Sequence, residues 1–137
     1  MIEQLKRELA IDEGCVNHTY LCSEGHKTVG IGHLCQENDP EFWEPIGTKV
    51  SEDRVDELFN KDIAWTITDC RDIISKFDDI PLESRLILAN MVFNLGRGRM
   101  LKFRKMLAAV DKQDWSTAAD EMHDSKWRQQ VPARAER

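Results

Sequence analysis

The sequence lacks long apolar runs and a regular cysteine pattern. No stretch approaches the roughly 20 apolar residues that a membrane-spanning helix needs. The first residues, Met-Ile-Glu-Gln-Leu-Lys-Arg, are charged and unlike a secretory signal. The four cysteines, at 15, 22, 35 and 70, show no repeated pair spacing. We therefore expect no signal peptide, no membrane anchor, and free thiols instead of a disulfide framework.

An excess of basic residues is also missing. The net charge of −6 argues against nucleic acid as the main partner, because phosphate binding needs a basic face. The charge is uneven, with 13 acidic and 5 basic residues from 36 to 80, and 10 basic and 6 acidic residues from 97 to 137. The second region could therefore attract an anionic polymer. With 41% hydrophobic residues, the 137-residue chain fits one compact domain.

The N-terminal half shows two kinds of periodicity. Ile2, Leu5 and Leu9 recur at helical spacing, and Gly14 is of the type that follows a helix end. β-Branched and aromatic residues at 19–22 and 27–31 then predict a small hairpin that carries Cys22 and Thr28. Residues 35–50 contain two prolines, a glycine and no period, which indicates a loop.

The C-terminal half is predicted to be helical. Ser51 is a suitable N-cap, and apolar residues at steps of three and four predict one long helix that ends before Pro81. The segment from Leu82 to Leu95 is the most apolar, and Gly96 should close it as the buried central helix. Short helices are expected near 100–110 and 115–124, and a last one should open at Pro132.

Three chemically active side chains lie close together in the sequence. Glu13 falls at the predicted end of the first helix, where the helix dipole disfavours the ionised carboxylate, as suits a proton donor. Cys22 and Thr28 add a thiol and a hydroxyl on the hairpin. Each also has an ordinary interpretation, as a solvated carboxylate, an inert small residue and a strand threonine.

The spacing of these residues matches a known signature: Glu, eight residues, Asp or Cys, five residues, Thr. Other matching blocks, in chain order, are Ile-Asp-Glu-Gly (11–14), Gly-Ile-Gly-His (30–33), Leu-Phe-Asn-Lys-Asp (58–62), Asn-Met-Val-Phe (90–93) and Trp-Arg-Gln-Gln-Val-Pro-Ala-Arg-Ala (127–135). In these blocks, which span nearly the whole chain, the sequence resembles the phage lysozymes of the T4 lysozyme type, glycoside hydrolase family 24.

The resemblance implies an α+β, mostly α, lysozyme-like fold. A small β-hairpin lobe and a helical lobe would be joined by the long helix, with an active-site cleft between them. Residues 1–137 would form a single lysozyme-like domain, with the β-containing lobe at about 13–60 and the helical lobe at about 61–137 packed with helix 1–12. We expect a monomer.

The implied activity is that of a muramidase. It would cleave the β-1,4 bond between N-acetylmuramic acid and N-acetylglucosamine in bacterial peptidoglycan, without a cofactor, for host cell lysis by a phage. The enzyme would stay in the host cytoplasm until a holin releases it to the periplasmic cell wall. The alternative is a catalytically inactive peptidoglycan-binding homologue, because Cys22 stands where most glycosidases carry their second carboxylate.

The resemblance also assigns roles to the three residues. Glu13 would be the general acid, and Thr28 could hold a water on the opposite face of the sugar. A Cys22 thiolate could stabilise the oxocarbenium-like transition state, place a water or attack the anomeric carbon, and these possibilities stay open. All three roles of Cys22 need deprotonation, for which His26 or Lys27 could help.

Further residues are assigned partly by the same resemblance and partly from their own positions in the sequence. Leu34, Asn90 and Phe93 match positions that line the sugar cleft, whereas Met106 and Glu121 stand where polar substrate-binding residues are expected. His33 follows Gly-Ile-Gly and should be a structural partner of Asp62, with its pKa raised by that carboxylate. Trp115 and Trp127 are assigned to core packing.

A metal site is a third possibility. Cys22, His26, His33 and Cys35 place two thiols and two imidazoles within 14 residues. Their spacing lacks the short Cys-x-x-Cys pairs of zinc ribbons, so we expect no metal.

Overall fold

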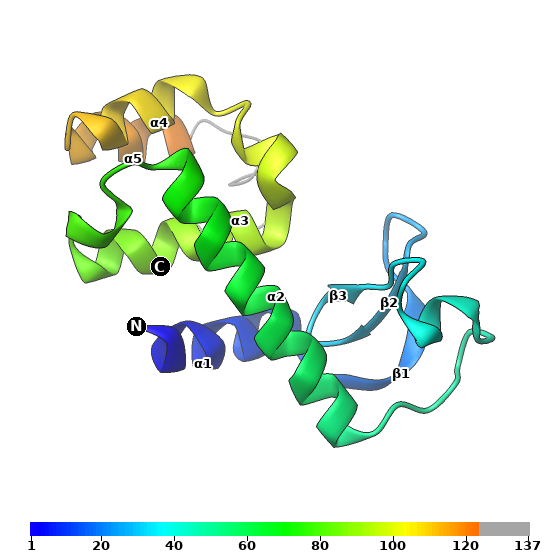
Figure 1. Cartoon of the computed structure of the whole chain (residues 1–137). Helices are drawn as coiled ribbons and strands as arrows, with labels where there is room; N and C mark the ends of the chain where they lie inside the picture. Colours follow the sequence, from blue (N-terminus) through cyan, green and yellow to red (C-terminus); the bar gives the residue numbers. More distant parts are fainter. Residues whose placement is uncertain (124–137) are drawn as a thin grey trace. The chain divides into compact units, whose positions relative to one another are not determined.

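The computed structural model describes residues 1–123, which form five α-helices and one three-stranded antiparallel sheet (Figure 1). Two compact units make up the chain: residues 2–64, and Met1 together with the residues from Trp65 onward. This combination of helices with one small sheet confirms the expected mostly α, α+β class. The predicted lobe boundaries, and the packing of helix 1–12 on the helical lobe, stay predictions.

The first unit begins with α1 (Ile2–Glu13), whose apolar face buries Leu5 and Leu9 completely. The helix ends at Gly14, which has a φ of +69° and donates its N–H to the Ala10 carbonyl at 3.0 Å. This is the glycine cap that the sequence predicts, because glycine adopts a left-handed conformation without steric cost.

The sheet has the order β1-β2-β3, with β1 (Val16–Leu21), β2 (Lys27–Gly30) and β3 (His33–Leu34). The predicted hairpin corresponds to β1 and β2, but β3 was missed because two residues give no periodicity. Cys22 lies in the turn after β1 rather than on a strand. A Cβ on Gly30 would lie 3.0 Å from Val55 Cγ1, so this glycine allows close packing of the sheet against α2.

Residues 35–50 are mostly irregular, as predicted, with one short 3₁₀ helix, η1 (Pro40–Trp43). The buried hydroxyl of Thr19 on β1 fixes the end of this segment. It donates to the Pro45 carbonyl at 3.0 Å and accepts the N–H groups of Gly47 at 3.0 Å and Thr48 at 3.1 Å. The segment is therefore held firmly against the sheet.

The next helix, α2 (Glu52–Ile73), begins where the sequence predicts. The Ser51 hydroxyl accepts the Arg54 N–H at 3.2 Å, as an N-cap does. The helix ends earlier than expected, and η2 (Phe77–Asp79) follows it. Ile74 and Phe77 are each 1% exposed, so the apolar spacing continues beyond the helix and made it look longer.

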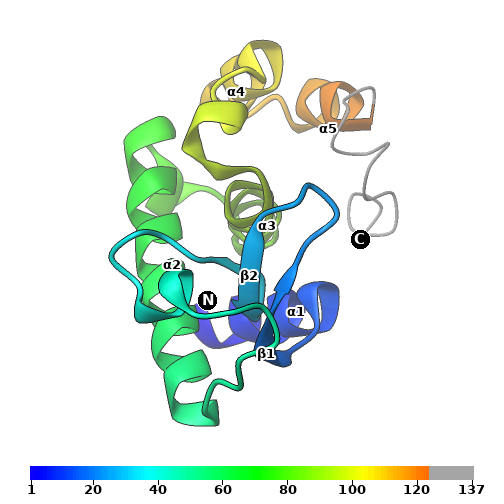
Figure 2. The ribbon, with the colours of Figure 1, turned by 90° about the vertical axis from the view of Figure 1, so that its right-hand side faces the viewer.

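The second unit contains α3 (Leu82–Met100), α4 (Arg104–Asp111) and α5 (Trp115–His123), and Figure 2 shows α4 and α5 side by side. Within α3 the helical backbone breaks at Gly96, with a φ of +80°, which confirms the predicted end of the apolar helix. The helix predicted at Pro132 and the packing of Trp127 lie outside the described residues. No helix within residues 1–123 combines the length and apolar character of a membrane span.

Candidate active site

Glu13 is the last residue of α1, and its side chain is partly exposed. It packs against the turn between β2 and β3: a Cβ on Gly32 would lie 3.1 Å from Glu13 Oε2 and 3.3 Å from Glu13 Cδ. Gly32 has a φ of +67°, which also favours glycine. The Gly-Ile-Gly sequence therefore leaves room for the carboxylate at the turn.

Cys22 lies at the start of a tight turn between β1 and β2. Its N–H donates to the His26 carbonyl at 2.9 Å, and its carbonyl accepts the N–H of Gly25 at 2.9 Å. Hydrogen bonds to the thiol from the backbone at Glu24 and at His26 lower the pKa of Cys22 below its usual value. The turn thus favours a partly exposed thiolate.

The groups that lower the pKa of Cys22 are not the His26 and Lys27 side chains that the sequence indicated. The backbone of His26, rather than its ring, contributes. Lys27 is engaged elsewhere, because its ammonium donates to the carbonyls of Phe42 at 2.6 Å and Glu44 at 2.5 Å. Backbone hydrogen bonds of this kind depend on turn geometry and leave no mark in residue type.

Thr28 lies on β2, directly opposite Tyr20 of β1. Its side chain is 2% exposed, and its hydroxyl donates to the His26 carbonyl at 2.9 Å. The hydroxyl therefore supports the turn that carries Cys22. Its predicted role in holding a water stays a prediction.

Tyr20 interacts electrostatically with both Glu13 and Cys22, and the sequence analysis did not identify it. Burial, followed by the negative charges of Glu13 and Cys22, raises the pKa of its phenol above the usual value. Glu13 and Cys22 therefore lie within electrostatic range of the same phenol, which stays protonated at neutral pH. Only the strand register, which pairs Tyr20 with Thr28, could have indicated this residue.

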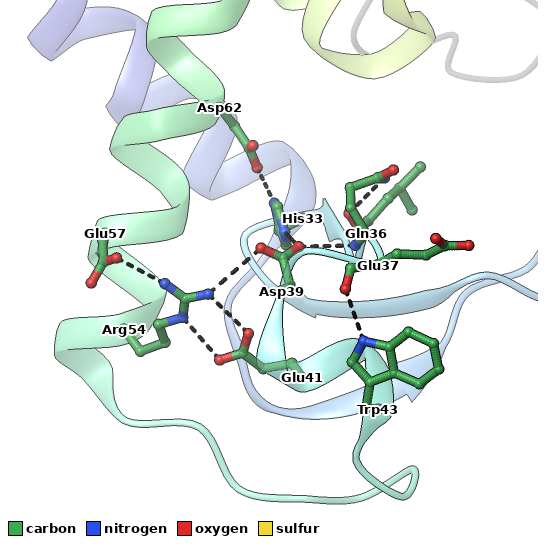
Figure 3. A network of polar contacts seen from close by, with 10 residues as sticks. His33, Gln36, Glu37, Asp39, Glu41, Trp43, Arg54, Glu57 and Asp62 are labelled. Atoms are coloured by element: carbon green, nitrogen blue, oxygen red, sulfur yellow. Dashed lines mark hydrogen bonds and ion pairs between the residues drawn. The ribbon is translucent and has the colours of Figure 1, made fainter.

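A second polar cluster lies in the same unit, centred on the buried His33 (Figure 3). His33 Nδ1 lies 2.6 Å from Asp62 Oδ2 on α2, and this is the contact predicted from the sequence. His33 Nε2 lies 2.7 Å from Asp39 Oδ2, a partner that was not predicted. Burial alone would lower the pKa of His33, but the hydrogen bonds and charges of Asp62 and Asp39 outweigh it, and the pKa is raised, as expected.

The cluster continues through Arg54 of α2. Its guanidinium donates to both oxygens of the buried Glu41 at 2.9 and 3.0 Å and lies 3.6 Å from Asp39 Oδ1. It also contacts Glu57 at 2.8 Å. We call this set the His33 network, and its members are His33, Asp39, Glu41, Arg54, Glu57 and Asp62. It connects the segment 35–50 and β3 to α2.

The sequence was compared with known proteins. The family model described as phage lysozyme matches residues 10–135. The chain belongs to the phage lysozyme family. It is 29% identical to "Probable T4-type lysozyme 2" and 31% identical to "Probable T4-type lysozyme 1" of Dictyostelium discoideum, in each case over 100% of this chain and 92% of the relative. It is also 30% identical to the pre-baseplate central spike protein Gp5 of Enterobacteria phage T4, over 100% of this chain and 26% of that protein.

Membership of this family confirms the expected lysozyme-like fold and makes the chain a lysozyme-type hydrolase. Family membership does not fix the second residue of the catalytic signature, where either Asp or Cys occurs. In this chain the residue is Cys22, held in a turn that favours its thiolate. The candidate site thus combines a carboxyl group, a thiol and a protonated phenol.

The predicted substrate-binding residues fall in both units of the chain. Leu34 is 46% exposed and pairs with Thr28 across β2 and β3. The others belong to the second unit. Asn90 and Met106 are buried, at 3% and 1% exposed, and Phe93 and Glu121 are partly exposed. Core packing accounts for Met106 without a ligand, and the substrate contacts of all five stay predictions.

The four groups considered for a metal do not gather in one place. Both ring nitrogens of His33 face carboxylates, and burial raises the pKa of the Cys35 thiol to about 11. Among residues 1–123, no three His, Cys, Asp or Glu side chains are arranged to hold a metal ion. All four cysteines are free thiols.

Proposed function

We propose that this phage lysozyme is an N-acetylmuramidase. It hydrolyses the β-1,4 bond between N-acetylmuramic acid and N-acetylglucosamine in bacterial peptidoglycan. The observation that carries the proposal is that Glu13 packs on the β2–β3 turn of the same small sheet whose β1–β2 turn holds Cys22 and whose strand β2 holds Thr28. Both Glu13 and Cys22 also influence the Tyr20 phenol electrostatically. Glycoside hydrolysis needs a proton donor and a negative group near the same sugar, and this grouping offers both.

In the proposed reaction Glu13 is the general acid. Its proton passes to the glycosidic oxygen as the bond to the anomeric carbon breaks, and a water molecule supplies the hydroxyl that the anomeric carbon gains. The partly exposed position of Glu13 at the end of α1 and its contact with the turn at Gly32 support this role. A carboxyl group packed on a rigid turn keeps a fixed direction toward the substrate.

Cys22 supplies the negative group. Its thiolate stabilises positive charge at the anomeric carbon, directs the attacking water or attacks that carbon itself. The backbone hydrogen bonds that lower the pKa of Cys22 support all three roles equally, so the choice among them is a matter for experiment. Thr28 assists by supporting the turn and by holding the water.

The test is reducing-sugar release from purified Gram-negative sacculi. The wild type is compared with Glu13→Gln, Cys22→Ser and Cys22→Asp, and circular dichroism checks that each variant folds. We expect wild type and Cys22→Asp to release sugar, and the other two to lose at least about a hundredfold in rate. Survival of Cys22→Asp would identify the thiol as a replacement for the usual carboxylate.

The alternative is an inactive homologue that binds peptidoglycan. It is favoured if folded wild-type protein sediments with sacculi but releases no more sugar than Glu13→Gln does. Restored release in Cys22→Asp alone would then show that loss of the second carboxylate had ended turnover. This outcome would overturn the muramidase proposal for the natural sequence.

We further propose that the enzyme lyses a phage host from within. It would stay in the host cytoplasm until a holin opens the membrane and would then act on the periplasmic wall. The resemblance to phage lysozymes supports this setting. The test is turbidity of Gram-negative cells that express the protein: lysis should follow within minutes of holin co-expression and should not occur with the protein alone.

A further inference from the structure

Trp43 on η1 exposes 71% of its surface, more than any other tryptophan whose exposure the structure describes. An indole is the largest apolar side chain, and exposed tryptophans that are held in place are typical of binding surfaces. No role for Trp43 follows from the sequence signature. Its position in the same unit as Glu13 and Cys22 raises the question of what it binds.

Two contacts hold the indole in place, and Figure 3 shows one of them, the hydrogen bond to Glu37. Trp43 Nε1 donates to the Glu37 carbonyl at 2.8 Å, and the ring packs edge-on against Phe42, with 4.9 Å between the ring centroids and an angle of 74° between the planes. The ring is therefore ordered before a ligand arrives, which lowers the entropy cost of binding. Because the N–H is already used, a ligand would be recognised by the face of the ring.

The segment that carries Trp43 is tied to the strand that carries Thr28. Lys27, the residue before Thr28, donates to the carbonyls on both sides of Trp43, those of Phe42 and Glu44. Its ammonium also lies 5.8 Å from the centroid of the Phe42 ring. Thr19 on β1 holds the segment again from Pro45 to Thr48. Trp43 is thus fixed to the framework of the candidate site.

The charge around Trp43 limits the ligand. Residues 36–47 include four carboxylates and no lysine or arginine. Asp39 and Glu41 are paired within the His33 network, and the Lys27 ammonium offsets part of the charge of Glu37 and Glu44. The surface around the indole is therefore weakly negative and does not attract phosphate-rich or carboxylate-rich polymers. A neutral sugar fits, because its C–H face suits the electron-rich indole and its hydroxyl and amide groups can donate to carboxylates.

We propose that Trp43 is a stacking platform for an uncharged N-acetylglucosamine residue of the glycan strand. This inference rests on the proposed function, because it takes the glycan from there. It adds a binding position carried by η1, outside the Glu13, Cys22 and Thr28 group. The occupant is the sugar without a lactyl carboxylate, since the acidic surroundings disfavour N-acetylmuramic acid.

The test uses chitohexaose, an uncharged oligomer of N-acetylglucosamine, and the full-length chain. Glu13→Gln serves as the background so that no cleavage disturbs the titration. Calorimetry then compares this background with added Trp43→Ala, Trp43→Phe and Trp65→Ala. Trp65 is the matched control, because it is also exposed, at 62%, but lies on α2 in the second unit.

We expect Trp43→Ala to weaken chitohexaose binding about tenfold and Trp65→Ala to leave it unchanged. Trp43→Phe should lie between them, because it keeps a ring but loses the hydrogen bond to Glu37. In the active enzyme, Trp43→Ala should raise KM on sacculi with little change in kcat. Melting temperatures confirm that the variants are folded.

Equal binding by Trp43→Ala and Trp65→Ala, or no binding of chitohexaose by the background protein, would overturn the proposal. Failure of the proposed function looks different, because wild type would then release no sugar from sacculi whatever the result at Trp43. If wild type cleaves sacculi and Trp43→Ala binds chitohexaose as tightly as the background does, the stacking proposal is wrong and the proposed function stands.

Discussion

The candidate site and the His33 network lie in the same unit but are held together in different ways. His33 uses both ring nitrogens for carboxylates, and Arg54 engages three acidic side chains. Cys22, in contrast, is held mainly by backbone hydrogen bonds of its own turn. The centre of the network, formed by His33, Asp39 and Glu41, is buried, whereas Glu13 and Cys22 are partly exposed.

We infer that the His33 network mainly stabilises the fold, whereas Glu13 and Cys22 carry the reaction. A side chain that is buried and paired on every polar atom contributes to folding and has no spare capacity for a substrate. The Cys22 sulfur accepts hydrogen bonds from backbone N–H groups, but it is partly exposed and can therefore still meet a ligand on its open side. Changes in the network should therefore lower stability, while changes around Glu13 and Cys22 should lower activity in a folded protein.

The largest expected effect on activity follows from Gly32→Ala. The new Cβ would lie 3.1 Å from Glu13 Oε2, so the carboxylate would have to move by a few tenths of an ångström. A displacement near 1 Å can cost about a hundredfold in rate, so we expect this smaller shift to cost about tenfold in sugar release from sacculi. Circular dichroism should show a folded protein.

The matched control is Gly96→Ala on α3. Gly96 also has a positive φ, +80°, but a Cβ there meets no atom within 4 Å. Both variants carry a similar backbone cost of about 1–2 kcal/mol, so their melting temperatures should fall by similar amounts. If the two variants lose activity equally, backbone strain is the cause and the placement of Glu13 by Gly32 is wrong.

The next effect concerns stability and its dependence on pH. His33→Ala leaves Asp39 buried without its imidazole partner, so we expect a loss of about 3 kcal/mol in the free energy of unfolding near pH 5. Urea denaturation measures it. Arg71→Ala removes an exposed pair with Asp78 and should have little effect at any pH.

The pH dependence follows from the two pKa directions. The pKa of His33 is raised in the folded state, so its contribution is complete below 6.5 and is lost as pH rises through the folded pKa. The pKa of Asp39 is lowered by the Gln36 backbone and His33 despite burial, so its contribution is complete above 3.8 and is lost at lower pH. The cost of His33→Ala should therefore be largest between these values and smaller at pH 9. A cost that does not vary with pH would contradict the charged pair.

Much of this architecture could be predicted from sequence, because helices leave a strong period. The Gly14 cap, the Ser51 N-cap and the break at Gly96 each follow from one residue type with one conformational preference. The two-residue strand β3 has no period, and the end of α2 was hidden by buried apolar residues that continue the spacing.

The polar network was only partly predictable. Asp62 was predicted because His33 follows Gly-Ile-Gly at a strand end and was expected to face the long helix, but Asp39, Glu41 and Arg54 come from a loop and a helix surface without a motif. Tyr20 and Trp43 were missed for the same reason, since register and exposure decide what they contact. Residue types showed which chemistry was available, and three-dimensional placement decided which groups meet.

The smallest expected effect is on the reactivity of Cys22, a partly exposed thiol that is compared here with the buried thiols of Cys35 and Cys70. Burial raises the pKa of Cys35 to about 11 and that of Cys70 to about 12, so neither should react with iodoacetamide at pH 7.5. In a Cys15→Ser background, mass spectrometry should therefore find one modification, at Cys22. Because nucleophilicity falls as thiolate fraction rises, the rate should exceed that of N-acetylcysteine amide by only about threefold for each unit of pKa lowering. Added Cys22→Ser should remove the label, and a rate below that of the small thiol would mean that the turn does not favour the thiolate.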